Sequence, residues 1–160
     1  MAFFAQSKPR ESLMREVSSN LWELHEKGAI VCITTNGAVS RLGRAQLLRG
    51  CARQAAERFP GLASRLGALI AAEGNHVHDL GDGLVSFPVE ETPYDNPDPE
   101  IIRRSAMGLV ELADRCHWQE IILPRPGCGS GGLDWKDVRP LIEQILDDRF
   151  VLITCIGLGV

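Results

Sequence analysis

The residue types most suited to ligand chemistry form a glycine-rich segment late in the chain, Gly127-Cys128-Gly129-Ser130-Gly131-Gly132. Glycines let the backbone come close to a ligand, so several N–H groups can point at one anion. The segment lies between an apolar run, 120–123, and a helical pattern, whose positive dipole end also favours an anion. The alternative is a sharp strand-to-helix turn without a ligand, but four glycines exceed what a turn requires. The pattern favours a phosphate site.

Two well-known nucleotide motifs do not account for this segment. It satisfies the spacing G-x-G-x-x-G, but a dinucleotide fold needs further strand–helix units after that motif, and only one helix and one strand are predicted to follow. The phosphate loop of nucleoside triphosphatases ends in Gly-Lys-Ser or Gly-Lys-Thr, and no such sequence follows here. The segment is therefore a candidate phosphate site of another kind.

A second candidate loop follows the apolar run 29–34 and opens with Thr35-Asn36-Gly37, a turn signal. The amide of Asn36 can both donate to and accept from a sugar hydroxyl. The stretch 41–58 holds five arginines and a single acid, so it is basic within an acidic chain. Arg41 and Arg44 are candidates to meet phosphate through their forked donors. The alternative for either arginine is an exposed helix face.

Three other groups have weaker patterns. His76 and His78 lie on one face of a predicted strand, but no third metal ligand is evident, so no metal site is expected. Cys128 lies beside a helix start, which can lower a thiol pKa, although the spacing assigns it no base. Asp134 is a candidate base, and the alternative is that it caps the helix after it.

The elements that would position these groups alternate along the chain. Apolar runs predict strands over 14–17, 29–34, 77–80, 84–89, 120–123 and 150–155. Apolar spacing and capping residues predict helices over 45–58, 62–73, 98–117 and from 134 onward. Such alternation is typical of an α/β domain with a mixed, mainly parallel sheet covered on both faces. The loops after 34 and after 123 both leave carboxyl ends of strands, so neighbouring strands would bring them to one crevice.

Composition limits the function classes. The chain has 160 residues, 44% hydrophobic and 24% charged, which suits a single folded domain over 13–160 after a flexible lead-in over 1–12. The net charge of −4 disfavours duplex nucleic acid as a partner. Five cysteines without a C-x-x-C pair do not indicate a disulfide framework. No apolar stretch is long enough for a membrane span, so we expect a soluble, cytoplasmic protein without a cofactor.

Taken together, the two loops resemble those of the macrodomain family, in the branch that includes ADP-ribosyl-glutamate hydrolases. The resemblance covers about 14–155. It depends on the two loops described above and on four short sequences outside them, which are Asn20-Leu21-Trp22-Glu23, Gly43-Arg44-Ala45, Gly50-Cys51-Ala52 and Leu84-Val85-Ser86-Phe87-Pro88. Its most specific part runs from Leu123-Pro124-Arg125-Pro126 through the glycine-rich segment to Leu133-Asp134-Trp135.

The resemblance implies a three-layer α/β/α sandwich that binds ADP-ribose in the crevice between the two loops. It places Asn20 near the adenine amine and Asn36 by the distal ribose, with Gly50 and Cys51 on one side of the diphosphate. The segment from Gly127 to Gly131 would wrap the other side. The complete set of expected ligand-binding residues is Asn20, Leu21, Thr35, Asn36, Gly43, Arg44, Gly50, Cys51, Pro126, Gly127, Cys128, Gly129, Ser130, Gly131 and Gly132.

Four positions depart from the family pattern. Asn20 stands where the family usually has Asp, and Leu48 adds bulk where the loop that follows 29–34 usually has Gly. Glu90 stands where related enzymes often have Lys after Phe-Pro-x. The catalytic Asp of the glutamate-hydrolase branch falls near Gly131, so a mechanism based on a lysine adduct does not transfer.

The resemblance leaves three functions open. The first is an enzyme that removes an ADP-ribosyl group or dephosphorylates ADP-ribose 1″-phosphate, with Asn36, Asp134 or Glu90 as candidate catalytic residues. The second is a binding module that holds ADP-ribose or an ADP-ribosylated target without chemistry. The third is an interaction protein that has lost the ligand. The sequence does not indicate an oligomeric state.

Overall fold

The computed structural model describes residues 13–155 of the chain. A single sheet runs through the centre of the molecule. The lead-in predicted over 1–12 lies outside the described residues. The strands of the sheet are β1 (Arg15–Ser19), β2 (Ile30–Thr35), β3 (His78–Gly81), β4 (Leu84–Pro88), β5 (Ile121–Pro124) and β6 (Phe150–Cys155). Their order across the sheet is β1-β6-β5-β2-β4-β3.

All neighbouring strands pair in parallel except β3 and β4, which form an antiparallel hairpin. The hairpin turns through Asp82 and Gly83, which both have positive φ angles, 54° and 74°. This conformation explains why the sequence places glycine in the turn. The prediction of a mixed, mainly parallel sheet is confirmed, and β1 is the edge strand that the sequence predicted near 14–17.

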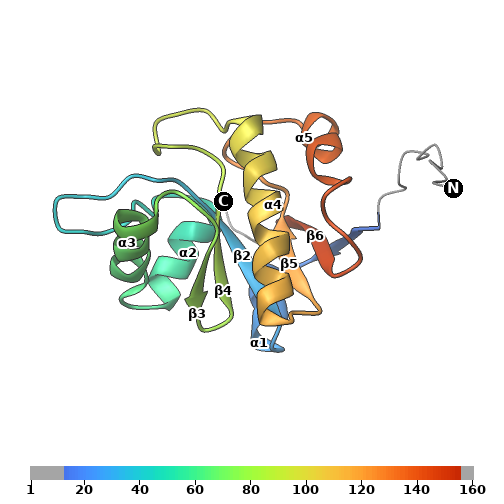
Figure 1. Cartoon of the computed structure of the whole chain (residues 1–160), viewed down its shortest axis with the longest axis horizontal. Coiled ribbons are helices and arrows are strands. Elements are labelled where there is room, and N and C mark those ends of the chain that lie inside the picture. The colour runs from blue at the N-terminus through green and yellow to red at the C-terminus, as the bar shows by residue number, and fades with distance from the viewer. Residues whose placement is uncertain (1–12, 156–160) are drawn as a thin grey trace, which may run out of the picture.

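Helices cover both faces of the sheet (Figure 1). They are α1 (Leu21–Glu26), α2 (Gly50–Arg58), α3 (Leu62–Glu73), α4 (Pro99–Cys116) and α5 (Trp135–Ile142). Helices α4 and α5 pack on one face, and α1, α2 and α3 pack on the other. The molecule is therefore an α/β/α sandwich of three layers. Across 13–155, none of the helices is both long and apolar enough to cross a bilayer.

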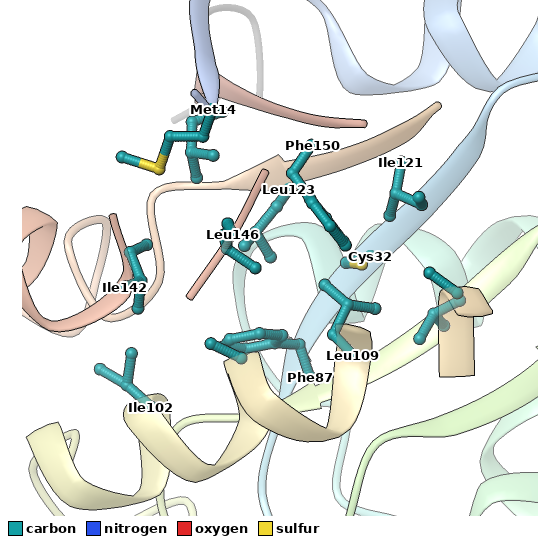
Figure 2. Packing of buried hydrophobic residues seen from close by; sticks show 14 of the residues in the cluster. Met14, Cys32, Phe87, Ile102, Leu109, Ile121, Leu123, Ile142, Leu146 and Phe150 are labelled. Carbon is teal, nitrogen blue, oxygen red and sulfur yellow. The ribbon is translucent and has the colours of Figure 1, made fainter. Parts of the chain in front are cut away.

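Alternation along the central strands builds a separate apolar core on each face. Cys32 faces α4 and α5, whereas its neighbours Val31 and Ile33 face α1, α2 and α3. Figure 2 shows the first core, in which Phe87 and Leu109 pack beneath Phe150. Since side chains on a strand point alternately to opposite faces, a strand buried on both faces reads as a continuous apolar run.

Two predicted elements differ from the structure. Helix α2 begins at Gly50, not at 45, because Ala45 instead forms a β-bridge with Val39 and hydrogen-bonds to Ala63 in α3. Leu48, which a helix over 45–58 would place on its apolar face by spacing, is 47% exposed. Helix α1 was not predicted, since six residues are too few to present a clear apolar period.

Candidate functional site

The two predicted loops meet at one cavity of about 400 Å³. Strand β2 lies between β4 and β5 and pairs in parallel with both, so the carboxyl ends of all three strands reach the same edge of the sheet. The cavity walls come from the loop after β2 with the start of α2, the loop after β4, and the glycine-rich loop after β5. A volume of this size lies within the range of small-molecule sites, roughly 300–1,000 Å³.

The glycine-rich loop presents unused backbone donors to this cavity. Gly127 has a φ of 75°, and its carbonyl accepts a hydrogen bond from the N–H of Leu133, which folds the loop back on itself. Gly129, Ser130 and Gly131 line the cavity. Within residues 13–155, their N–H groups donate to no other residue. Three adjacent free donors around a concave surface are the arrangement that binds an anion.

The start of α2 supplies a second set of donors to the same cavity. Gly50, Cys51 and Ala52 form the first turn of the helix and all line the cavity. The N-cap residue Arg49 makes no capping hydrogen bond through its side chain, and the first turn contains no acid. The positive end of the helix dipole is therefore uncapped by any side chain and faces the cavity, where it favours a negative ligand.

Asn36 lies at the floor of the same cavity and is 7% exposed. Its Nδ2 donates to the carbonyl of Gln46 at 3.0 Å, and its Oδ1 accepts from the N–H of Ala38 at 3.0 Å. These bonds fix the orientation of the amide. Since an amide has two donor hydrogens and two acceptor lone pairs, one of each remains for a ligand.

Glu90 brings a nearly buried carboxylate to the cavity, with a side chain that is only 10% exposed. Its Oε1 lies 3.7 Å from Nη2 of Arg49, which also donates to the carbonyl of Pro93 at 2.9 Å. Burial raises the pKa of Glu90, the Arg49 guanidinium lowers it, and Asp95 raises it, with burial the largest cause. Water in the cavity therefore meets a carboxyl group that holds its proton to a higher pH than usual.

The cations that line the cavity are Arg49 and Arg125, not the predicted Arg41 and Arg44. The loop after β2 makes a hairpin turn that rests on α3, and this turn carries Arg41 and Arg44 into solvent. Arg125 follows β5 directly, and its guanidinium lies 5.0 Å from the centre of the Trp135 ring. Its position immediately after a buried strand was a signal that the sequence reasoning did not use.

Some of the other predicted residues line the cavity and some do not. Asn36, Gly50, Cys51, Glu90, Gly127 and the three glycine-loop residues with free N–H groups line the cavity. Five residues of the first half lie outside the lining, namely Asn20, Leu21, Thr35, Gly43 and Arg44. Four residues around the second loop also lie outside it, namely Pro126, Cys128, Gly132 and Asp134. For all of these residues, a contact with ligand remains a prediction.

Asn20 has a structural task that the sequence did not reveal. It is the N-cap of α1, and its Oδ1 accepts hydrogen bonds from the N–H groups of Trp22 and Glu23, at 2.9 and 3.3 Å. The oxygen proposed to meet an adenine amine is thus engaged by the helix. Asp134 is likewise the N-cap of α5, but its side chain makes no capping bond and the residue is exposed.

The helix start beside Cys128, which the sequence offered as a possible cause of a lowered thiol pKa, does not lower it. Burial, the largest cause, raises that pKa to about 11, although Arg125 opposes the shift. The thiol packs partly against the core beneath α4 and α5, where a thiolate would lose hydration. Burial also raises the pKa of Cys51, whose Sγ lies 3.6 Å from Oγ1 of Thr34.

Of the two histidines, His76 and His78, the ring nitrogens of His78 contact groups of the protein. His78 is buried, with Nε2 at 2.9 Å from the carbonyl oxygen of Gly74 and Nδ1 at 3.4 Å from a carboxylate oxygen of Glu73. The ring of His76 lies 6.4 Å from that of His78. Among residues 13–155 there is no group of three or more side chains that could hold a metal ion.

Comparison with solved structures identifies the architecture. The chain superposes on the macrodomain of Thermus aquaticus DarG with a TM-score of 0.69 and 22% identity, covering 89% of this chain and 97% of that one. The macrodomain of Mycobacterium tuberculosis DarG gives a TM-score of 0.67 and 21% identity, covering 89% and 98%. This chain has the macrodomain fold. No family model and no curated protein matches the sequence.

A third similar structure is a complex with ADP-ribose. It is Thermosipho africanus DarTG in complex with ADP-ribose, with a TM-score of 0.63 and 16% identity. The match covers 78% of this chain and 37% of that longer one. At such identities the likeness establishes the fold, and the prediction of a macrodomain-like α/β/α sandwich is confirmed. What the cavity binds must be argued from its own residues.

Proposed function

We propose that this chain binds ADP-ribose or a derivative of it in the cavity at the carboxyl ends of β2, β4 and β5. The observation that carries the proposal is the convergence of two unused donor sets on one cavity. One set is the free N–H groups of Gly129 to Gly131, and the other is the uncapped start of α2 at Gly50. A diphosphate carries several oxygens and suits a site in which two donor sets line one cavity.

The remaining polar groups suit the sugar parts of such a ligand. Asn36 keeps a free donor and a free acceptor, and Glu90 offers acceptor oxygens, which together match ribose hydroxyls. Arg125 and Arg49 add positive charge at the cavity wall, in a chain whose net charge is −4. The macrodomain fold and the ADP-ribose complex of Thermosipho africanus DarTG support the same ligand.

We further propose that the protein hydrolyses an ADP-ribosyl linkage, with Glu90 as the general base. In the reaction, a water oxygen bonds to the anomeric C1″ as the bond from C1″ to the acceptor breaks. Glu90 takes the water proton, and the departing acceptor gains a proton from solvent. Because burial raises its pKa, Glu90 is a stronger base than an exposed carboxylate. Asn36 can orient the water, whereas Asp134 lies outside the cavity lining.

Calorimetric titration tests the binding proposal. We expect ADP-ribose to bind at least about tenfold more tightly than AMP, which lacks the second phosphate and the distal ribose. NAD serves as a third ligand because it keeps both groups but carries nicotinamide on that ribose. Equal or undetectable binding of ADP-ribose and AMP would overturn the proposal.

Matched glycine variants test where the ligand binds. A side chain added at Gly129 meets no atom within 4 Å, so Gly129→Leu should fold while filling space at the cavity wall. We expect it to weaken ADP-ribose binding about tenfold or more. Gly108→Ala is the control, since its added carbon makes only ordinary contacts with Val77 and does not line this cavity. Equal affinity in both variants would place the ligand elsewhere.

Turnover assays separate the enzyme from the binding module. ADP-ribosylated protein and ADP-ribose 1″-phosphate are the two substrates to test, with Glu90→Gln as the variant. Activity that falls about 100-fold or more in this variant supports Glu90 as general base. Tight ADP-ribose binding without turnover of either substrate would support a non-catalytic binding module, for which the carboxylate has no chemical role.

A further inference from the structure

The walls of the cavity differ in polarity from one part to another. The start of α2 at Gly50 and the glycine-rich loop at Gly129 to Gly131 offer free N–H donors and no carboxylate to a ligand. The wall formed by the loop after β4 offers a carboxylate, that of Glu90. An anionic group is therefore favoured at one part of the cavity and disfavoured at the other.

Pairing of two strand ends brings Glu90 and Asn36 to the same cavity. The register places Thr35 opposite Pro88, and the N–H of Val89 donates to the carbonyl of Thr35 at 2.9 Å. Asn36 follows Thr35 directly, and Glu90 follows Pro88 after one residue, Val89. The side chain of Asn75 then holds the Glu90 carbonyl through a 3.0 Å hydrogen bond. The acceptor end of the cavity is thus built into the sheet edge.

The Glu90 carboxylate is available to a ligand. Within residues 13–155, no hydrogen bond reaches either of its oxygens, and its one ion pair, with Arg49, has a separation of 3.7 Å. Of the two charges, the carboxylate is the buried one at 10% exposure, and the guanidinium is 51% exposed. Solvent therefore screens Arg49 more than it screens Glu90.

We propose that Glu90 makes the cavity selective for ADP-ribose whose distal ribose carries hydroxyls or a neutral or cationic substituent, and against a distal ribose that carries a phosphate. This inference rests on the proposed function, and it narrows the derivatives that the site accepts. A carboxylate accepts hydrogen bonds from ribose hydroxyls and repels a phosphoryl group at the same place. The same chemistry lets an acidic residue in dinucleotide folds recognise an unphosphorylated ribose.

Paired titrations with ADP-ribose and ADP-ribose 1″-phosphate test this selectivity. We expect the wild-type protein to bind ADP-ribose at least about tenfold more tightly than the 1″-phosphate. Glu90→Gln keeps the size and removes the charge, so the ratio should fall to about threefold or less, mainly because the 1″-phosphate binds better. Glu91→Gln is the matched control. Its carboxylate is 56% exposed, pairs with Arg104 and accepts a 3.3 Å hydrogen bond from Asn75. The amide oxygen of Gln can accept the same bond, so the ratio should stay as in the wild type.

Each outcome has a distinct meaning. Equal binding of the two nucleotides by the wild type would overturn the selectivity while leaving ADP-ribose binding intact. A ratio that Glu90→Gln leaves unchanged would overturn the role of Glu90. Absence of binding by both nucleotides would overturn the proposed function and this inference with it. The wild-type ratio tests the selectivity even where the variant fails to fold.

Discussion

At the scale of single residues, the site combines groups whose positions cost stability. Glu90 has a carboxylate that is mostly removed from water and receives no hydrogen bond from residues 13–155. Under the proposed function, such a group serves the ligand and not the stability of the fold. Arg49 offsets part of the cost from a distance of 3.7 Å. The balance between these effects can be measured.

Glu90→Gln should be more stable than the wild type near neutral pH, and this difference should shrink as the pH falls. The pKa of Glu90 is raised in the folded state, chiefly by burial. The stability that this group contributes is therefore fully present below its unfolded pKa, about 4.3, and is lost as the pH rises through the folded pKa. Urea unfolding of both proteins at pH 4.5 and 7.5 measures this. A variant that is less stable at pH 7.5 would mean that the pair with Arg49 outweighs burial.

Cys128 should react slowly with iodoacetamide at neutral pH. Its pKa of about 11 keeps the side chain as a thiol below pH 9, and the thiolate is the reactive form. The alkylation rate should rise about tenfold for each pH unit between 7.5 and 9.5. Peptide mapping by mass spectrometry after timed alkylation measures the rate at this residue. Rapid modification at pH 7.5 would contradict the burial of the thiol.

At the scale of elements, patterns with a clear period were predictable, and packing between elements was not. The strand 29–34 and the helix 62–73 follow from their apolar runs, and the glycine-rich segment follows β5 as its position indicated. The stretch 45–49 has helical spacing but is not helical, because Ala45 pairs with Val39. Burial of Glu90 beside the cavity depends on how three strand ends meet, which no local pattern contains.

Gly67→Ala in α3 should destabilise the protein by about 1–3 kcal/mol. An added carbon at Gly67 would lie 2.1 Å from the carbonyl oxygen of Gly43, so the hairpin turn after β2 must move away from the helix. Gly108→Ala in α4 is the matched control, because its added carbon lies 3.6 Å from Val77 and alanine favours a helix by up to about 1 kcal/mol. Urea unfolding should give opposite signs for the two variants. A stabilised Gly67→Ala would show that the turn does not rest on α3.

At the scale of the whole molecule, one sheet separates two apolar cores. Ile102 of α4 lies in the core on one face, and Ile33 of β2 points into the core on the other. The sheet contributes side chains to both cores, so loss of either core would expose one face of the sheet. We therefore expect a single cooperative unfolding transition.

The two cores should nevertheless respond independently to small changes. Ile33→Val and Ile102→Val should each cost about 0.5–1.5 kcal/mol, since both side chains are fully buried. The double variant should lose the sum of the two within about 0.5 kcal/mol, because the two side chains belong to different clusters. Denaturant unfolding of the three variants measures this. A larger departure from the sum would mean that strain crosses the sheet.

Arg49 joins the start of α2 to the loop after β4, through Pro93 and Glu90. The two rims that it connects are more than 30 residues apart in the chain. Under the proposed function, a nucleotide would therefore meet two cavity edges that Arg49 already holds together. Two independent loops would lose conformational entropy on closing around a ligand. Here that entropy is lost when the chain folds, before any ligand binds.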